Sequence, residues 1–241
     1  MHLTGQRTFR RVEVGRSHEY VAEQIRRQIM LRLIPPQGAL PPEREFAKML
    51  GVGRATVQEA IRLLEEEGLL TRRRGRSGGT FVLGPTGAEE SLRELIPKLR
   101  REIPLIEEAL AFRLAIEPAA AKLAAEMRQD GELPDLRRAH DEGVAEEGHA
   151  EILAWDSGFH LTIARMARNR FFAEGIEAAR LALGDALVAL PESRRWRGRS
   201  DREHAAILEA VEAVDAPAAE RAMRKHVLHT EQAIRSLLRA L

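Results

Sequence analysis

The first part of the chain places apolar residues four positions apart, the spacing of a helix that buries a single face. Residues 17–33 carry this stripe on Val21, Ile25, Ile29 and Leu33. The prolines and the glycine that follow end this helix. Two shorter helices are then predicted over residues 42–50 and 54–67, separated by the tight turn Gly-Val-Gly.

After these helices the pattern changes to short β-prone pieces. Residues 69–72 and 80–83 are such pieces, and they flank a loop rich in glycine and arginine. This arrangement predicts a β-hairpin. Three helices followed by a small hairpin within residues 17–83 are typical of a winged helix-turn-helix domain. Residues 1–16 are expected to form a flexible N-terminal arm.

Beyond the hairpin, residues 84–91 have the composition of a linker, and helical spacing then continues to the end of the chain. Breaks between helices are expected at Pro104 and across residues 191–200, and Pro118 is expected to kink its helix or to start a new segment. The predicted helices span residues 88–101, 104–128, 132–147, 149–168, 170–190, 200–214 and 216–240.

The predicted fold class is therefore mainly α. It consists of an N-terminal winged helix-turn-helix with a small β-hairpin wing, followed by an all-α helical bundle. Residues 84–103 are assigned to a linker and connecting helix, and residues 104–241 to the bundle. A chain of 241 residues with 44% hydrophobic side chains can bury cores of this size.

Composition narrows the class of protein. No run approaches the ~20 apolar residues of a membrane span, and the N-terminus lacks the apolar segment of a secretory signal. We therefore expect a cytoplasmic protein with no membrane partner. The absence of cysteine excludes disulfides and thiolate metal sites, so that a metal would be held by His, Asp or Glu.

The formal net charge of +1 conceals two oppositely charged parts. Residues 1–83 contain 15 Lys and Arg against 9 Asp and Glu, whereas the remainder contains 23 against 28. The basic part coincides with the predicted winged helix. A basic excess of this size favours a polyanionic partner, although many surface domains carry one.

The predicted helix-turn-helix carries polar side chains suited to reading DNA. In this motif the second of two packed helices enters the major groove with its N-terminal residues against the base edges. The side chains that project from the side opposite the apolar face are Arg44, Arg54, Thr56 and Gln58. The hairpin adds Arg72, Arg73, Arg74 and Arg76. Such a charge run is by itself more often a solvated face than a phosphate contact.

These residues resemble a known family. The run LPPEREFAKMLGVGRATVQEAIRLLEEEGLLTRRRGRSGGTFV is similar to the winged helix of the GntR family of bacterial transcription regulators, essentially without gaps over residues 17–83. The resemblance implies DNA contacts from four positions, namely Arg44, Arg54, Thr56 and Gly75. With this motif around them, the wing arginines, Arg74 and Arg76 included, are also expected to contact DNA.

Gln58 departs from the family pattern, which mostly has arginine at this position. Arginine favours guanine O6 and N7, whereas glutamine pairs most naturally with adenine N6 and N7. Gln58 is therefore a candidate for reading a different base. The alternative is that Gln58 has merely lost a contact.

The bundle contains candidate metal ligands. Asp156 and His160 are four residues apart and can reach one ion from one helix face, although such pairs are common on exposed faces. His204 and His226 lie on two successive predicted helices, which would bring both side chains to the bundle interior if the helices are antiparallel neighbours. One carboxylate and three imidazoles suit Zn, Ni, Mn or another first-row divalent ion.

The same residues carry a second resemblance. Residues 112–126, 156–172 and 202–230 are similar, in this order, to pieces of the FCD ligand-binding domain of the FadR-type branch of the GntR family. The resemblance implies a divalent metal held by Asp156, His160, His204 and His226. It also implies a small organic acid as effector, bound at or beside that metal.

Other residues of the bundle have competing interpretations. By its match to the family's R-x-x-x-E-P piece, Arg113 is expected to face the effector carboxylate, and its alternative is a salt bridge to Glu117. His229 could replace His226 as a ligand, but the position that matches the family is favoured. The remaining assignments are surface positions for His140 and His149, and core packing, a cavity wall or a subunit contact for Trp155 and Trp196. The basic stretch of residues 191–200 has no firm account.

The sequence thus predicts a homodimeric transcription regulator, expected to act as a repressor and not as an enzyme. Each winged helix would read one half of a palindromic operator in double-stranded DNA. A small carboxylate would modulate operator affinity from the bundle. The alternatives are a metal-dependent hydrolase, for which no convincing general base is present, and a DNA-binding dimer that senses nothing.

Overall fold

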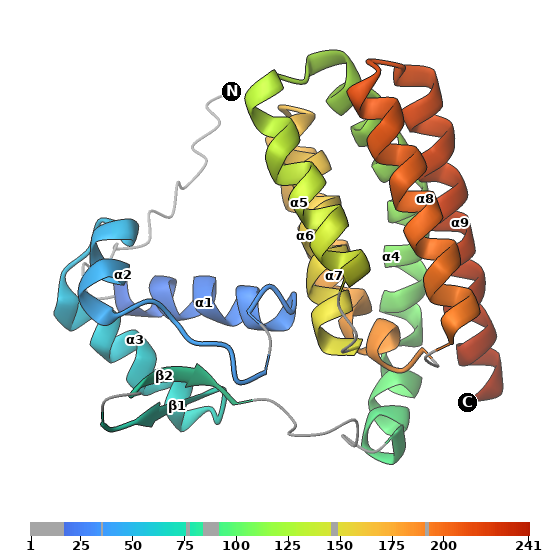
Figure 1. The fold of residues 1–241 in the computed structure, drawn as a ribbon. Coiled ribbons are helices and arrows are strands. Elements are labelled where there is room, and N and C mark those ends of the chain that lie inside the picture. Colours follow the sequence, from blue (N-terminus) through green and yellow to red (C-terminus); the bar gives the residue numbers. More distant parts are fainter. Residues whose placement is uncertain (1–16, 35, 76–77, 84–91, 146–148, 191–192) are drawn as a thin grey trace, which may run out of the picture.

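The structure is a computed structural model that describes residues 17–241 apart from residues 35, 76–77, 84–91, 146–148 and 191–192. A small N-terminal domain lies beside a taller bundle of long helices (Figure 1). The arm of residues 1–16 and the linker of residues 84–91 lie outside the described residues. The predicted fold class is confirmed.

The small domain is a winged helix-turn-helix. Its helices are α1 (Ser17–Met30), α2 (Glu43–Leu50) and α3 (Arg54–Glu66), and its wing is an antiparallel pair of β1 (Leu70–Arg73) with β2 (Gly79–Val82). The register pairs Leu70 with Val82 and Arg73 with Gly79. Gly51 ends α2 at a φ of +66°, a left-handed conformation that glycine adopts without strain.

The apolar stripe of α1 forms the core of this domain as predicted, except that α1 ends at Met30 and Leu33 packs against the bundle instead. Val21, Ile25 and Ile29 are buried against α3, where Val57 and Ile61 are fully enclosed. The polar face of α3 remains exposed because no other element of the domain covers it. Packing of this core therefore leaves α3, the second helix of the helix-turn-helix, with its polar face toward solvent.

The bundle contains six α-helices and one short 3-10 helix within the part of the chain that the structure describes. In chain order these elements are α4 (Leu92–Met127), η1 (Asp130–Glu132), α5 (Leu133–Ala145), α6 (His149–Met166), α7 (Arg170–Val188), α8 (Arg194–Glu212) and α9 (Ala216–Ala240). Polar side chains cap three of their N-termini, namely Asn169, Ser193 and Asp215.

The expected break at Pro104 is wrong, because α4 runs through this residue and through Pro97 as well. Pro118 does not start a new segment, since α4 continues through it too. Two predicted helices are therefore one. Each proline removes one helix hydrogen bond. Burial of the opposite apolar positions compensates for this loss, since Ile106, Leu110 and the alanines near the C-terminal end are enclosed by neighbouring helices.

The expected loop over residues 191–200 is shorter than predicted. The helix α8 begins at Arg194, where the Ser193 hydroxyl accepts a hydrogen bond from the Trp196 backbone N–H at 3.1 Å. Most of the basic stretch is therefore the first turns of a helix, and residues 191–192 lie outside the described part. The glycine and arginines of this stretch indicated a loop, but the cap that Ser193 provides allows a helix to begin there.

The bundle interior contains three apolar cores within the described residues, and polar side chains lie between two of them along α4. Helix α4 contributes Leu99, Ile106 and Leu110 to one core and Ala121 and Ala124 to the other. Buried charged residues of α4 lie between these two sets along the helix. Within the described residues, no helix combines the length and apolar character that a membrane crossing requires.

Candidate metal centre and DNA-reading face

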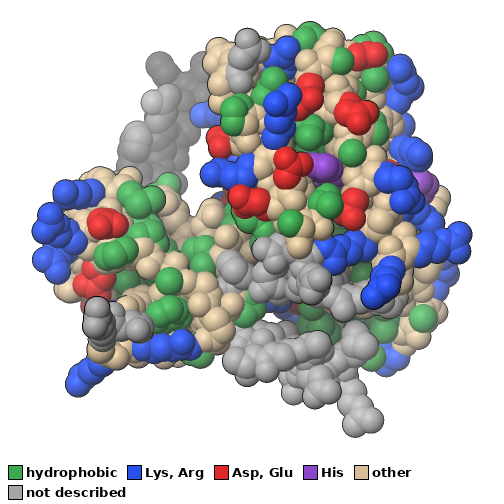
Figure 2. Space-filling model, in the orientation of Figure 1, with side chains coloured by type: hydrophobic (Ala, Val, Ile, Leu, Met, Phe, Trp, Pro, Cys, Tyr) green, Lys and Arg blue, Asp and Glu red, His purple; other side chains and the backbone are tan. Residues whose placement is uncertain are grey.

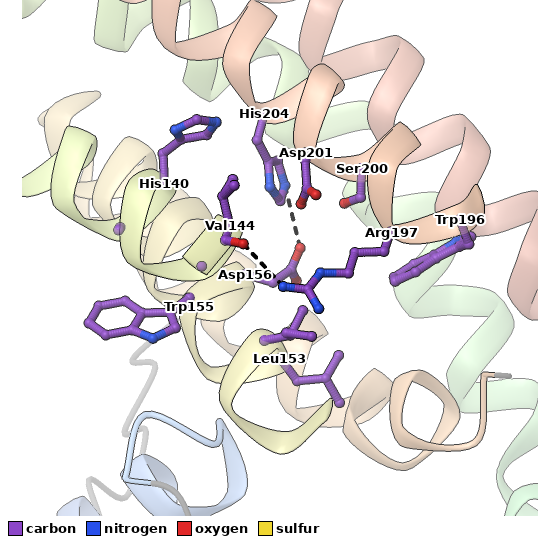
Figure 3. A pocket seen from close by; sticks show the side chains of 13 residues that line it. His140, Val144, Leu153, Trp155, Asp156, Trp196, Arg197, Ser200, Asp201 and His204 are labelled. Atoms are coloured by element: carbon purple, nitrogen blue, oxygen red, sulfur yellow. Dashed lines mark hydrogen bonds and ion pairs between the residues drawn. The ribbon is translucent and has the colours of Figure 1, made fainter. Parts of the chain in front are cut away.

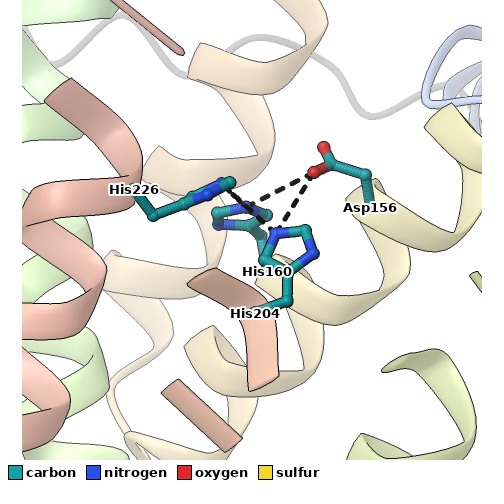
Figure 4. A group of neighbouring side chains, drawn as sticks. All are labelled: Asp156, His160, His204 and His226. Atoms are coloured by element: carbon teal, nitrogen blue, oxygen red, sulfur yellow. Dashed lines mark hydrogen bonds and ion pairs between the residues drawn. The ribbon is translucent and has the colours of Figure 1, made fainter. Parts of the chain in front are cut away.

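The four predicted metal ligands meet in the bundle interior (Figure 4). Helix α6 supplies Asp156 and His160, α8 supplies His204 and α9 supplies His226. One ligand atom from each side chain lies within 4.8 Å of the others. Ligands held about 2.1 Å from one ion are themselves roughly 3.0–4.2 Å apart, so this group has close to the spacing that a metal requires.

The ring nitrogens that converge are the Nε2 atoms. His226 Nε2 lies 3.1 Å from His160 Nε2 and 3.2 Å from His204 Nε2. Asp156 Oδ1 lies 3.4 Å from His204 Nε2 and 3.8 Å from His160 Nε2. The three imidazoles therefore direct the same ring position at one point beside a carboxylate oxygen.

Two carboxylates hold the outer nitrogens of these rings. His160 Nδ1 lies 2.6 Å from Glu117 Oε2, and His226 Nδ1 lies 3.3 Å from Glu203 Oε2. A carboxylate at Nδ1 favours the tautomer with its proton there, which leaves the Nε2 lone pair facing inward. Lone pairs in such close contact repel unless a proton or a cation lies between them. This is the arrangement that a divalent ion satisfies.

Electrostatics keep Asp156, His160 and His204 in the protonation states that bind a metal. Burial lowers the pKa of His160 to about 4 and that of His204 well below its usual value, so both rings are neutral at pH 7. Burial alone would raise the pKa of Asp156. The Arg180 guanidinium and the neighbouring imidazoles outweigh it and hold that pKa well below its usual range.

Arg113 lies in the alternative arrangement that the sequence left open. Its guanidinium forms a fully buried ion pair with Glu117, in which Nε and Nη2 both contact the carboxylate. Glu117 thus joins Arg113 to His160. Burial would raise the pKa of Glu117, but Arg113 and then His160 hold it well below its ordinary value. Nothing in this geometry tests an effector contact by Arg113.

Arg180 of α7 is a site residue that the sequence analysis missed. Its Nη2 donates to Asp156 and, at 3.0 Å, to Ser157 Oγ. Its Nε and Nη1 are buried and have no hydrogen-bond partner within the described part of the chain. The available signal was an arginine at helical spacing with Ile176 and Leu183, inside an otherwise apolar stripe.

A small hollow lies directly beside the cluster (Figure 3). Its volume is about 20 Å³, room for about one water molecule. Asp156 and His204 form part of its wall, together with Trp155 of α6 and both Trp196 and Arg197 of α8. The basic stretch of residues 191–200, which the sequence left unexplained, therefore contributes to this wall. Arg197 donates to the carbonyl oxygen of Val144 at 3.1 Å.

Among the described residues, no other histidine joins the cluster. His229 contacts Glu203 from the next turn of α9, outside the group of four. His140 was expected on the surface, but its side chain is only 15% exposed, because it lines the small hollow. The side chain of His149 lies outside the described residues.

The predicted DNA-contacting residues gather on one face of the small domain. The arginines Arg44, Arg54, Arg72, Arg73 and Arg74 line a single hollow of about 990 Å³ between α2, α3 and the wing. Figure 2 shows Lys and Arg side chains along the outer edge of this domain. Phosphates of DNA are bound by such groupings.

The remaining predicted contacts lie near this hollow, except for Arg76, which lies outside the described residues. Thr56 is half-buried and Gln58 is exposed, both in the N-terminal half of α3. Gly75 has a φ of +110°, which the hairpin turn needs and glycine permits. A Cβ on Gly78 would lie 2.5 Å from the Arg73 carbonyl oxygen, so the turn requires glycine there too.

Comparison with known proteins gives a family match for each of the two domains. The family described as "Bacterial regulatory proteins, gntR family" matches residues 18–82, and the FCD domain family matches residues 108–229. The putative HTH-type transcriptional regulator RmpR of Mycobacterium gastri is 34% identical over 62% of this chain, which spans about half (54%) of that protein.

A longer match joins both domains. The putative L-lactate dehydrogenase operon regulatory protein of Escherichia coli is 28% identical over 89% of this chain and 86% of its own length. Among solved structures, E. coli McbR/YncC has the same fold, with a TM-score of 0.52 at 18% identity, over 92% of this chain and 98% of that one.

Both relatives are named as regulators, one of transcription and one of an operon. The gntR family of bacterial regulatory proteins matches the winged helix-turn-helix. The FCD match covers half of the chain and includes all four candidate metal ligands. The chain therefore belongs to the GntR family, as a DNA-binding transcription regulator with an FCD domain.

Proposed function

We propose that this regulator is a sensor whose operator affinity is set by a small organic acid bound at or beside a divalent metal. The metal would be held by Asp156, His160, His204 and His226. The observation that carries this proposal is the convergence of three Nε2 atoms on one carboxylate oxygen. Mixed nitrogen and oxygen ligands of this kind suit Zn, Ni or Mn.

Unsatisfied N–H donors beside the cluster support an acid as effector. The buried N–H groups of Arg180 that have no described partner would gain hydrogen bonds from a carboxylate. Arg113, one buried ion pair away, is the second candidate. When bound, the ion would supply a positive charge and open coordination positions for the acid's oxygens.

The size of the adjoining hollow implies that the site must open. At about 20 Å³ it holds roughly one water molecule, less than any organic acid needs. Residues of α5, α6 and α8 form its wall, with Trp155 from α6 and both Trp196 and Arg197 from α8. We infer that an acid separates these helices when it binds. A ligand that prefers the opened state shifts the population toward it.

On the DNA side, we propose a homodimer in which each α3 reads one half of a palindromic operator, with half-site centres about one turn of DNA apart. The arginine-lined hollow would hold the phosphate backbone. Arg54 and Thr56, at the start of α3, would lie against base edges. We expect the protein to act as a repressor, in the cytoplasm where its operator is.

The test combines elemental analysis with a thermal-shift screen. Protein purified without added metal should carry a divalent ion, and its Tm should rise with a small acid. L-Lactate is the first acid to test, since the name of the E. coli relative refers to an L-lactate dehydrogenase operon. Bound ligand stabilises the folded state by about 2.7 kcal/mol at 100 times its Kd.

Matched variants assign the ligands. His226→Ala should lose the metal and the response of Tm to the acid. His229→Ala, one turn away on α9, should retain both because His229 is outside the cluster. Equal metal content in the two variants would refute the ligand set. Full metal content with no effect of any acid on operator affinity would leave a DNA-binding dimer that senses nothing.

A further inference from the structure

Gln58, the residue that departs from the family pattern, is paired with a carboxylate. Its amide nitrogen Nε2 donates to Glu43 Oε2 at 2.7 Å. Glu43 lies in the first turn of α2 and Gln58 in the N-terminal half of α3. The bond therefore joins the two helices at the edge of the arginine-lined hollow, which Glu43 itself lines.

This hydrogen bond determines which way the Gln58 amide points. A glutamine amide has a donor side and an acceptor side, but an ionised carboxylate only accepts. The NH₂ group must therefore face Glu43, and Oε1 must face away from it. Because Gln58 is exposed, this oxygen is available to a partner outside the protein.

Glu43 adds a second acceptor beside the first. Its Oε2 is occupied by Gln58, and no hydrogen bond or ion pair is found for its Oε1 within the described residues. Arg44 and Arg54, which line the same hollow, supply the positive charge that makes a carboxylate tolerable near phosphates. The pair thus presents two oxygen acceptors and the one amide hydrogen of Gln58 that Glu43 does not take, where arginine, the family's usual residue, presents donors alone.

The major groove offers few donors that could meet these oxygens. Guanine presents O6 and N7, and thymine presents O4, all of them acceptors. The donors in the groove are the exocyclic amino groups, N6 of adenine and N4 of cytosine. We propose that Glu43 and Gln58 form one reading unit that selects an amino-bearing base, adenine or cytosine, at one operator position.

This inference rests on the proposed reading of an operator by α3. Selected-site binding with random duplexes first gives the preferred motif of the wild-type protein. The motif of Gln58→Ala then identifies the position that Gln58 reads, because preference changes there. Failure to obtain any motif would contradict the operator proposal itself, whereas a motif with guanine or thymine at this position overturns only the present inference.

Base analogues test the amino group directly. At the identified position adenine is replaced by 2-aminopurine, or cytosine by pyrimidin-2-one, either of which removes the amino group from the major groove. Wild-type affinity should fall about five-fold or more, within the discrimination of one good base contact. The affinity of Gln58→Ala should be the same for both duplexes. An equal loss in the two proteins would overturn the inference.

The role of Glu43 is tested against a neighbour of the same charge. Glu43→Ala frees the amide of Gln58 to rotate and offer its donors, so preference against guanine and thymine should fall about five-fold. Glu45→Ala removes the same charge from the same turn of α2 and should keep the preference. If the two variants select identical motifs, Glu43 does not position Gln58.

Discussion

At the scale of single residues, the candidate metal site depends on side chains that never touch the metal position. Glu117 and Glu203 face the outer nitrogens of His160 and His226 and thereby direct the inner nitrogens toward Asp156. Outer carboxylates of this kind typically raise metal affinity by orienting the ring and increasing its basicity. Arg180 performs the corresponding task for Asp156.

Glu203 provides the residue-scale prediction. Glu203→Gln keeps the shape of the side chain but removes the charge that orients His226, so metal affinity should fall about 10- to 100-fold. Competition with a chromogenic chelator measures this change. The control is Glu209→Gln, on the exposed face of the same helix, which should bind metal as the wild type does. Unchanged affinity in Glu203→Gln would show that His226 needs no carboxylate partner.

Prediction from sequence reached the ligands but not their supports. Asp156, His160, His204 and His226 could be chosen because their residue types and their family match are explicit. Glu203 and Arg180 could not, because their roles depend on which helix faces which. A sequence does not distinguish an exposed glutamate from a buried one. The Glu43–Gln58 contact was missed for the same reason.

At the scale of elements, the end of α1 connects the two domains. Leu31, directly after α1, is 3% exposed and packs among Ala120 of α4, Leu161 and Ala164 of α6, and Ile176 of α7. Helix α6 therefore carries Asp156 and His160 in the metal cluster and also packs Leu31. A shift of α6 on effector binding would reach the winged helix through this contact.

Leu31→Ala should weaken this connection. Loss of the side chain leaves a cavity, and burial of this degree predicts a decrease of about 2–5 kcal/mol in the free energy of unfolding, measured by urea denaturation. The acid should then alter operator affinity less than in the wild type. Met30→Ala is the control because Met30 is 48% exposed, and it should change neither quantity appreciably. An undiminished acid response in Leu31→Ala would contradict the proposed connection.

The elements themselves were predicted well where apolar spacing is regular. The three helices and hairpin of residues 17–83 have the expected order because each carries a clear stripe and clear turn residues. The errors lie where packing overrides local preference. Pro104 sits on the exposed side of α4, so the helix continues past it, and Ser193 starts α8 within the expected loop.

At the scale of the whole molecule, one chain carries both a candidate DNA-reading face and a cluster of candidate metal ligands. The arginine-lined hollow lies between α2, α3 and the wing, and the cluster lies among α6, α8 and α9. Communication between them requires two states of the molecule that the acid binds with different affinity. The metal is the proposed element on which that difference depends.

The most direct test measures operator affinity with and without the acid in metal-loaded and metal-stripped protein. Fluorescence anisotropy with a labelled duplex of the selected motif gives each Kd. For a repressor, the acid found in the screen should raise the Kd of the metal-loaded protein by about 5- to 150-fold, the usual range of such coupling. It should leave the stripped protein unchanged. An equal change in both forms, or none in either, would contradict metal-dependent sensing.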